Sequence, residues 1–466
     1  MTGRSNDTAG RRTRRDFLRG AAATAMGTIA AGGLRHSTAF AAPNVLRGPL
    51  TKVCKQRPDL LDNESAKGIE VVQLTTEPDV PASHLYMEAQ VFTPDSKRFL
   101  LHRSATAHGS SKSDPNHQYL RCDLDDGCSL HPLTEETGAT AASVSPEGKY
   151  VYYFVNETTV GGGRLTLKRV NLDGTGRETI LVIDSVLPGT NFRPSGIYPL
   201  STISSDGQRL AISAFLGDGK TEGAPYGLMV FDLRRASVSL VYQGPTWCNM
   251  HAQYCRSTES EASHDILIQE NHGNVATASG SITRLTGGEG ADIHVIRDDG
   301  SDFRNLPWGR DGNEFCQGHQ CWRGRTTWAI TSTGTRKPPE AQLIEGRPAP
   351  HAGHVGIKTP GGVRNDLTRE FPNPHFYHFA TDIAGKRLVS DAAPFNQGGK
   401  IYVADLGEPG RDPLRKFRYL LCPKSSCQKH AHIHPFLSPD GLLGFFNSDE
   451  SGILQAYLIR GLDGVG

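Results

Sequence analysis

Residues 92–101 read FTPDSKRFLL: an apolar residue, a Thr-Pro-Asp turn, a basic pair and a second apolar run. The same phrase, in part degenerate, recurs six more times, with successive turns 52 to 63 residues apart. A strand, a tight turn and a second strand make up each copy, and such a hairpin cannot bury its apolar face alone. The seven turns centre on Asp95, Glu147, Asp206, Glu261, Gly324, Ala384 and Asp440.

The period of the repeat predicts a seven-bladed β-propeller, an all-β fold with about four strands in each blade. A chain of 466 residues suits one such domain, because the blades bury their apolar faces against one another. The 52 glycines and 28 prolines are typical of a turn-rich protein. We expect the propeller to span residues 70–466 and to close where strand 71–74 pairs with strand 456–459. Residues 42–69 are interpreted as a linker.

The N-terminal residues have the pattern of an export signal rather than of a blade. Residues 11–20 read RRTRRDFLRG, which contains a twin-arginine motif, and residues 21–33 form a mild apolar segment. Ala39-Phe40-Ala41 offers a cleavage site of the small-x-small type. We therefore expect residues 1–41 to be a twin-arginine signal peptide and the mature chain to be periplasmic or secreted. No later stretch is apolar enough to predict a membrane span.

The charge balance excludes one broad class of partner. The chain has 50 Lys and Arg residues against 49 Asp and Glu residues, and its formal net charge is +1. No global positive field therefore favours nucleic acid or an anionic membrane surface. Binding of a polyanion would require a local patch.

Cysteine usage is consistent with an oxidising compartment. Eight of the nine cysteines fall into close pairs, which are Cys122 with Cys128, Cys248 with Cys255, Cys316 with Cys321, and Cys422 with Cys427. We expect these pairs to form local disulfides after export, which leaves Cys54 as the odd thiol. A structural zinc site that uses the same thiolates is the alternative, although no CxxC pair is present.

Histidines accompany three of the cysteine pairs, in different repeats. His251 and His319 each lie between the two cysteines of a pair, and residues 430–435 read HAHIHP. Because equivalent strands of a propeller converge on its central channel, these histidines are expected to meet around one point. The alternating histidines of HAHIHP project to one side of a strand, as ligation of zinc, manganese, iron or copper requires. A polar, hydrogen-bonded lining of the channel is the alternative interpretation.

Several segments resemble the oligogalacturonate lyases, over roughly residues 70–460. The segments are NMHAQYC (249–255), ENHG (270–273), EFCQGHQCW (314–322), FYHFATDIAGKRLVSD (376–391) and HIHPFLSPDG (432–441). The resemblance implies a seven-bladed propeller that binds a manganese-type ion through histidines and a glutamine, and that cleaves uronate oligosaccharides by β-elimination. Calcium and zinc are the alternative ions.

The same resemblance assigns roles to particular residues. It makes His319, His432 and His434 metal ligands and places His251 near the proton to be abstracted. The glutamine ligand of the family falls on Lys429, and Gln428 is the nearest substitute. Where those lyases carry an arginine after the ENHG-like segment, this chain has Ala291 and Asp292.

The first repeats are also similar to the propeller lyases that act on ulvan or on rhamnose-glucuronate linkages. In those enzymes a pair of histidines, a tyrosine and an arginine act together. The resemblance assigns these catalytic roles to His84, His102, Tyr153 and Arg169. The alternatives are a core aromatic for the tyrosine, a solvated strand face for the arginine, and hydrogen-bonded strand histidines.

The chemistry explains why such groups would be assembled. Elimination across a uronate removes the proton beside the carboxylate, so positive charge must offset the developing enolate-like charge. A neutral histidine or a tyrosine then takes the proton. We therefore expect an exported carbon-oxygen lyase that acts on a uronate-containing glycan. A noncatalytic scaffold that resembles TolB and binds a protein partner is the main alternative, and a metal-dependent hydrolase or oxidoreductase is a third.

Overall fold

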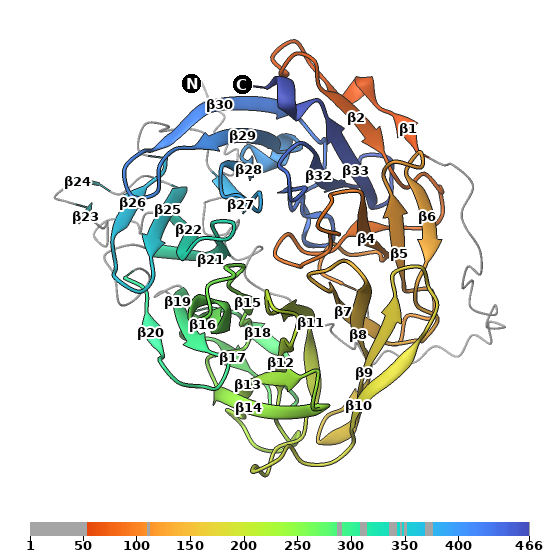
Figure 1. Ribbon diagram of the computed structural model, residues 1–466, viewed down its shortest axis with the longest axis vertical. Coiled ribbons are helices and arrows are strands. Elements are labelled where there is room, and N and C mark those ends of the chain that lie inside the picture. The colour runs from red at the N-terminus through yellow and green to blue at the C-terminus, as the bar shows by residue number, and fades with distance from the viewer. Residues whose placement is uncertain are drawn as a thin grey trace, which may run out of the picture.

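The computed structural model describes residues 54–109, 112–286, 291–307, 315–334, 343–344, 347–348, 352–368 and 376–465. Within these residues the chain forms seven sheets of four or five strands arranged around a common axis (Figure 1). The predicted all-β, seven-bladed β-propeller is therefore confirmed. The expected signal peptide, residues 1–41, lies outside the described residues.

The first three blades are four-stranded antiparallel sheets whose strands follow one another in the chain. Blade 1 consists of β3 (Ser83–His84), β4 (Arg98–Arg103), β5 (Gln118–Asp123) and β6 (Ser129–Pro132). Blade 2 consists of β7 (Ala139–Val144), β8 (Tyr150–Thr159), β9 (Gly162–Asn171) and β10 (Glu178–Ile183). Blade 3 consists of β11 (Gly196–Ile203), β12 (Arg209–Phe215), β13 (Tyr226–Asp232) and β14 (Ser237–Gly244).

Blades 4 and 5 each carry an inserted two-stranded hairpin between their second and third strands. Blade 4 consists of β15 (Gln253–Tyr254), β16 (Asp265–Asn271), β19 (Ala291–Arg297) and β20 (Arg304–Asn305), with the hairpin β17 (Val275–Ala276) and β18 (Ile282–Arg284). Blade 5 consists of β21 (Phe315–Trp322), β22 (Trp328–Gly334), β25 (Ala352–Lys358) and β26 (Arg364–Asp366), with the hairpin β23 (Leu343–Ile344) and β24 (Arg347–Pro348).

The last two blades complete the ring. Blade 6 consists of β27 (Phe376–Thr381), β28 (Arg387–Ala392), β29 (Lys400–Leu406) and β30 (Leu414–Leu421). Blade 7 consists of β31 (Phe436–Leu437), β32 (Gly444–Ser448), β33 (Gln455–Arg460), β2 (Glu70–Gln73) and β1 (Lys55–Gln56). Short 3-10 helices lie at η1 (Pro58–Leu60), η2 (Ala262–His264), η3 (Phe395–Gln397), η4 (Lys429–Ala431) and η5 (Leu462–Gly464).

The ring closes where the N-terminal strand joins the C-terminal blade. Val71 of β2 lies opposite Ile459 of β33 in antiparallel register, as the sequence predicts. Residues 55–60, which were expected to be part of a linker, instead add β1 to the outer edge of this blade and place η1 beside it. Arg57 then joins the two ends of the chain, because its Nη2 lies 2.8 Å from Glu450 Oε2.

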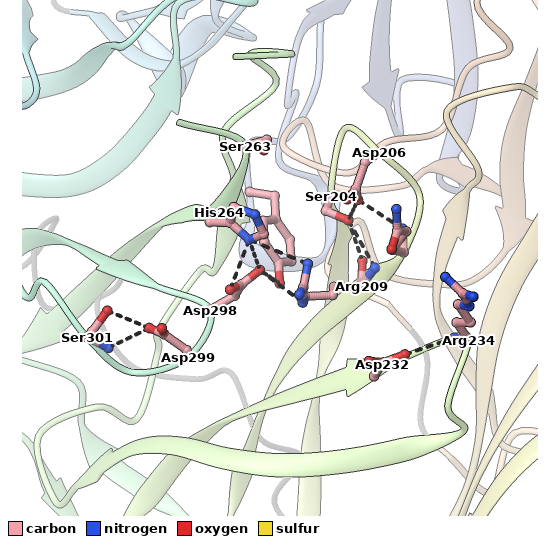
Figure 2. Close-up of polar contacts among 12 residues, drawn as sticks. Ser204, Asp206, Arg209, Asp232, Arg234, Ser263, His264, Asp298, Asp299 and Ser301 are labelled. Atoms are coloured by element: carbon pink, nitrogen blue, oxygen red, sulfur yellow. Dashed lines mark hydrogen bonds and ion pairs between the residues drawn. The ribbon is translucent and has the colours of Figure 1, made fainter. Parts of the chain in front are cut away.

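The repeated turn phrase has a common hydrogen-bond pattern, which Figure 2 shows for blade 3. Ser204 Oγ donates to Asp206 Oδ1 at 2.5 Å, and the Gln208 amide donates to the same carboxylate oxygen at 3.0 Å. The Arg209 amide donates to Ser204 Oγ at 3.0 Å. A hydroxyl and an acid two residues apart therefore bond the backbone of the turn, as Asx and ST turns do, and Thr93 with Asp95 and Ser438 with Asp440 repeat the pattern.

Neighbouring blades are joined by buried apolar and polar contacts. The rings of Phe99 in blade 1 and Phe445 in blade 7 have centroids 4.9 Å apart, and both residues are fully buried. Between blades 3 and 4, Arg209 Nε lies 3.5 Å from Asp298 Oδ2, and the same carboxylate lies 3.0 Å from His264 Nδ1 (Figure 2). Packing of blade on blade therefore supplies the core that a single hairpin lacks.

The cysteines differ from the sequence-based expectation. All nine are free thiols. The expected disulfides between Cys248 and Cys255 and between Cys316 and Cys321 are wrong, because the two members of each pair are buried in different hydrophobic clusters. The remaining expected pairs, Cys122 with Cys128 and Cys422 with Cys427, are also thiols in this structure. No helix among the described residues has the length and apolar character of a membrane span.

Candidate functional site

Six histidines from five blades converge at the channel, and we call them the channel cluster: His108, His251, His319, His378, His432 and His434. Four of the five segments that carry them either lead into the innermost strand of a blade or form it. Of these innermost strands, β15, β21 and β27 lie toward the middle of the ring (Figure 1). The fifth segment is the loop after β4, which carries His108. The expected convergence of His251, His319, His432 and His434 fits this arrangement.

Ring-to-ring distances define the cluster. The His378 ring centroid lies 4.6 Å from that of His319, 5.0 Å from that of His432 and 4.5 Å from that of His434. The His108 ring centroid lies 4.6 Å from that of His434. These imidazoles therefore surround a common volume rather than lining separate parts of the channel.

Three of the histidines meet the geometric requirement for a shared metal ion. His108, His432 and His434 each offer a ring nitrogen, and the three nitrogens lie within 4.8 Å of one another. His108 Nε2 and His432 Nδ1 are 3.2 Å apart. Two nitrogens bound to one ion at about 2.1 Å would be separated by roughly 3.0–3.4 Å, so this spacing fits a shared ion.

His434 gives the strongest indication that an ion belongs here. Its side chain is completely buried, and neither ring nitrogen has a hydrogen-bond partner. A buried polar group without a partner costs about 1–3 kcal/mol. Ligation of a metal ion would remove this cost.

His378 is oriented as a ligand by a buried carboxylate. Its Nδ1 lies 2.8 Å from Asp391 Oδ2, and both side chains are buried. Because Nδ1 donates its proton to the carboxylate, Nε2 keeps its lone pair for an ion or a proton. His319 packs on the other side of this ring and on Tyr377, whose centroid is 4.4 Å away.

The structure separates the two candidates for the glutamine position. Gln428 is exposed at the N-terminal end of η4, which does not support its expected role as a ligand. Lys429 is half-buried, and its Nζ has no hydrogen-bond partner. Lys429 lies three residues before His432 in the chain, and its charge adds to desolvation in lowering the pKa of that histidine. Burial lowers the pKa of Lys429 to about 8.

His251 belongs to a second chemical arrangement within the cluster. Its Nδ1 lies 3.1 Å from Oε2 of the buried Glu88, and its Nε2 lies 2.9 Å from the hydroxyl of Tyr198. The ring centroid of Tyr86 lies 5.0 Å from that of His251 and 4.6 Å from that of His434. Tyr86 therefore packs between this arrangement and the histidines that could share a metal ion. A carboxylate, an imidazole and a phenol in line form a path along which a proton can move.

Burial sets the protonation states of these groups. Desolvation lowers the pKa of His432 to about 4 and holds the pKa values of His319, His378 and His434 well below the usual range. These imidazoles are therefore neutral near pH 7, as metal ligation requires. Desolvation, followed by the nearby Glu88, raises the pKa of Tyr198, so its phenol stays protonated.

The two histidines expected to act from blade 1 lie outside the cluster. His84 is fully buried, and its ring packs edge-on against Phe436 and Phe445, with Nε2 2.9 Å from the Tyr457 carbonyl oxygen. It is therefore a core histidine. His102 is also buried and bonds Ser83 Oγ at 2.8 Å and His117 Nε2 at 3.1 Å. It touches a small cavity that His108 and Tyr198 also line, but both of its nitrogens are engaged.

Tyr153 and Arg169 are not brought to the channel cluster. Tyr153 lies on β8, and its hydroxyl donates to the Glu136 carboxylate at 3.1 Å. Arg169 lies on β9, where it pairs with Glu178 and packs 4.2 Å from the ring of Tyr150. Each side chain is engaged within blade 2, so the structure does not support their expected catalytic roles.

Three residues of the site were not expected from the sequence: His108, His378 and Tyr198. His378 lies five to six residues before its blade turn, as His319 and His434 do, so alignment of the repeats by their turns would have found it. His108 lies in a loop outside the repeated phrase. No sequence signal marks that position.

Comparison with solved structures supports the fold. No protein-family profile and no curated protein sequence matches the chain. An oligogalacturonate lyase in complex with manganese is similar with a TM-score of 0.64 and 16% identity, over 90% of this chain and 98% of that one. An oligogalacturonate lyase from Vibrio parahaemolyticus is similar with a TM-score of 0.63 and 16% identity, over 89% of this chain and 98% of that one.

A more distant similarity shows how widely the architecture occurs. A prolyl endopeptidase matches with a TM-score of 0.50 and 12% identity, over 83% of this chain and 50% of that one. Propellers carry unrelated activities, so this match bears on architecture alone. Taken with the seven blades, the comparisons show that this chain has the β-propeller fold found in the oligogalacturonate lyases.

Proposed function

We propose that the protein is a metal-assisted lyase that cleaves a uronate-containing glycan by β-elimination. The observation that carries this proposal is the channel cluster, in which imidazoles from five blades meet and the buried His434 has no other partner. A scaffold that binds a protein partner has no need to desolvate six histidines at one point. The similarity to a lyase in complex with manganese supports the same proposal.

The proposed ion is divalent, with manganese as the first candidate. His108, His432 and His434 would hold it, and His378, oriented by Asp391, packs against His434 at a ring-centroid distance of 4.5 Å. The ion would supply positive charge to offset the charge that develops on the substrate carboxylate. Nitrogen ligands of this kind suit manganese and zinc better than calcium.

The proton is proposed to leave the substrate through Tyr198 and His251. The raised pKa of Tyr198 keeps the phenolic proton in place until the reaction. As the phenolic oxygen takes the proton beside the uronate carboxylate, its own proton passes to His251 Nε2 at 2.9 Å. Glu88, 3.1 Å from Nδ1, stabilises the imidazolium that results. As the bond to the glycosidic oxygen breaks, Tyr198 gives the abstracted proton to that oxygen and recovers its own proton from His251.

Lys429 is proposed to recognise the substrate carboxylate. Its Nζ is buried without a hydrogen bond, and the residue lies three positions before His432, one of the proposed ligands. A uronate carboxylate bound to this ammonium would satisfy the buried charge with a charge-assisted hydrogen bond. The residue therefore provides the positive charge that a uronate substrate requires.

Export is proposed on the sequence of residues 11–41 alone. The twin-arginine route transports folded proteins, which would allow the ion to be bound before export. A periplasmic or secreted lyase would act on glycans outside the cytoplasm.

Ultraviolet absorbance of unsaturated uronate tests the proposed function. The full-length protein is incubated with oligogalacturonate, ulvan and rhamnose-glucuronate oligosaccharides, with added manganese and with a chelator. We expect absorbance to rise with at least one substrate and the rise to stop on chelation. No rise in absorbance with any of these substrates in the presence of manganese would favour the scaffold alternative. Activity that persists in chelator would refute the role of the ion.

A further inference from the structure

Blade 4 carries a second group of ligand-type side chains, which we call the blade-4 cluster: Glu270, His272, Asp292 and His294. Glu270 on β16 lies directly opposite Asp292 on β19 in antiparallel register. His272 and His294 each follow one of these acids by two residues in the chain. Because side chains two residues apart in an extended strand share a face, His294 lies on the same face of β19 as Asp292, and the turn after β16 brings His272 to the same carboxylate.

The four side chains are in contact. One ligand atom from each of Glu270, Asp292 and His294 lies within 4.8 Å of the others. His272 Nε2 lies 2.6 Å from Asp292 Oδ2 and 3.4 Å from Glu270 Oε2. Asp292, His272 and His294 are buried, whereas the Glu270 side chain is 15% exposed. An ion can therefore reach the cluster past Glu270.

His294 points to a missing ligand in this cluster. Its Nδ1 lies 2.9 Å from Asn305 Oδ1, so Nδ1 donates and Nε2 keeps its lone pair. Nε2 is buried without a hydrogen bond and lies 3.5 Å from Glu270 Oε2. The rings of Trp247 and Phe303 pack at 5.3 and 4.9 Å and exclude water from the imidazole. Metal ligands in proteins are often oriented in this way, by a hydrogen bond from the second ring nitrogen and by apolar neighbours that exclude water.

We propose that the blade-4 cluster binds a divalent first-row transition ion such as Mn²⁺ or Zn²⁺. Two carboxylates balance the charge of the ion, and two imidazoles favour these ions over Mg²⁺ and Ca²⁺, which prefer sites made of oxygen ligands. On binding, the ion takes the place of the proton between His272 Nε2 and Asp292 Oδ2. This site is distinct from the channel cluster, with which it shares no residue.

The bound ion would fix the segment that leads to His251. Thr246 Oγ1 lies 2.5 Å from Glu270 Oε1, and the Asn271 amide donates to the Thr246 carbonyl at 2.9 Å. The Gln269 amide donates to the Met250 carbonyl at 2.7 Å. Because β16 is bonded to residues 246–250 in this way, an ion on Glu270 also holds the loop immediately before His251.

Metal stoichiometry tests the proposal. The full-length protein is stripped with chelator and dialysed against Mn²⁺ alone and, separately, against Zn²⁺ alone, and bound metal is measured by mass spectrometry. We expect two ions per chain in the wild type and one in the His294→Gln variant. His434→Gln should also bind one, at the blade-4 cluster. His264→Gln is the matched control, because His264 pairs with Asp298 in the same blade but outside the cluster, and it should bind two.

The outcomes separate this proposal from the proposed function. Two ions in His294→Gln, or one ion in the wild type that His434→Gln abolishes, would overturn the blade-4 site. One ion in the wild type that only His294→Gln abolishes would support the blade-4 site while refuting the channel site. If thermal unfolding shows that His294→Gln is not folded, Glu270→Gln replaces it, since that side chain is partly exposed. We expect this variant to bind the second ion at least tenfold more weakly.

Discussion

Replacing Lys429 with methionine should stabilise the metal-free protein. The ammonium is half-buried without a hydrogen bond, and burial lowers the pKa of Lys429 from 10.5 to about 8. At about 1.4 kcal/mol for each pKa unit, the full cost of the buried charge is roughly 3.5 kcal/mol. Because the side chain is only half-buried, water screens part of this cost, and we expect a gain of about 1–2 kcal/mol at pH 7.

The gain should depend on pH in a defined direction. Below pH 8 Lys429 is charged in both the folded and the unfolded chain, so the folded state bears the whole cost. Between pH 8 and about 10.5 the folded chain has lost this proton while the unfolded chain still binds it, so wild-type stability rises with pH. Lys429→Met should therefore be more stable than the wild type at pH 7 and lose that advantage toward pH 10.5.

Urea denaturation in the presence of chelator, at pH 7 and at pH 10, measures both effects. Lys220→Met is the control, because Lys220 is exposed and its replacement should change neither value. The reasoning is refuted if Lys429→Met is no more stable at pH 7, or if its advantage stays constant with pH. In the activity assay the same variant should raise KM for the uronate glycan at least tenfold, because it lacks the proposed carboxylate partner.

Three further substitutions test other parts of the account. Asp391→Asn should weaken manganese binding by about 10- to 100-fold in calorimetric titration, because it removes the acceptor that orients His378; unchanged affinity would exclude His378 as a ligand. Tyr153→Phe should lose about 1 kcal/mol of stability in urea while keeping its turnover rate, since its hydroxyl bonds Glu136 away from the channel. Arg169→Ala should also keep the wild-type turnover rate, and a fall of more than tenfold in that rate would show that Arg169 takes part in the reaction.

The sequence was sufficient to predict the architecture. The spacing of the turns predicted the number of blades, because each hydroxyl-and-acid phrase makes its own hydrogen bonds, as Ser204 and Asp206 do. The closing pair of strands, with Val71 opposite Ile459, also followed from the pattern. These features are local, or they follow from the need to close a ring. Sequence reasoning reaches them without knowledge of side-chain contacts.

The channel cluster was only partly predictable. His251, His319, His432 and His434 lie in or just before inner strands, so topology alone brings them together. His108 could not be found, because it lies in the loop between β4 and β5, outside the repeated turn phrase. The position of a side chain in a loop depends on tertiary contacts, which the repeated sequence pattern does not reveal.

Two kinds of expectation differ from the structure for physical reasons. Tyr153 and Arg169 occupy β8 and β9, and their side chains satisfy partners within the blade rather than reaching the channel. Cysteines close in sequence can face different cores, as Cys316 and Cys321 do on β21. In both cases proximity along the chain was a poor guide to where a side chain points.

Diffraction at the manganese absorption edge, from crystals of the full-length protein grown with Mn²⁺, tests the central claim most directly. The account predicts an anomalous peak in the channel within about 2.3 Å of ring nitrogens of His432 and His434. A channel without a peak, or a peak that these two histidines do not contact, would contradict it.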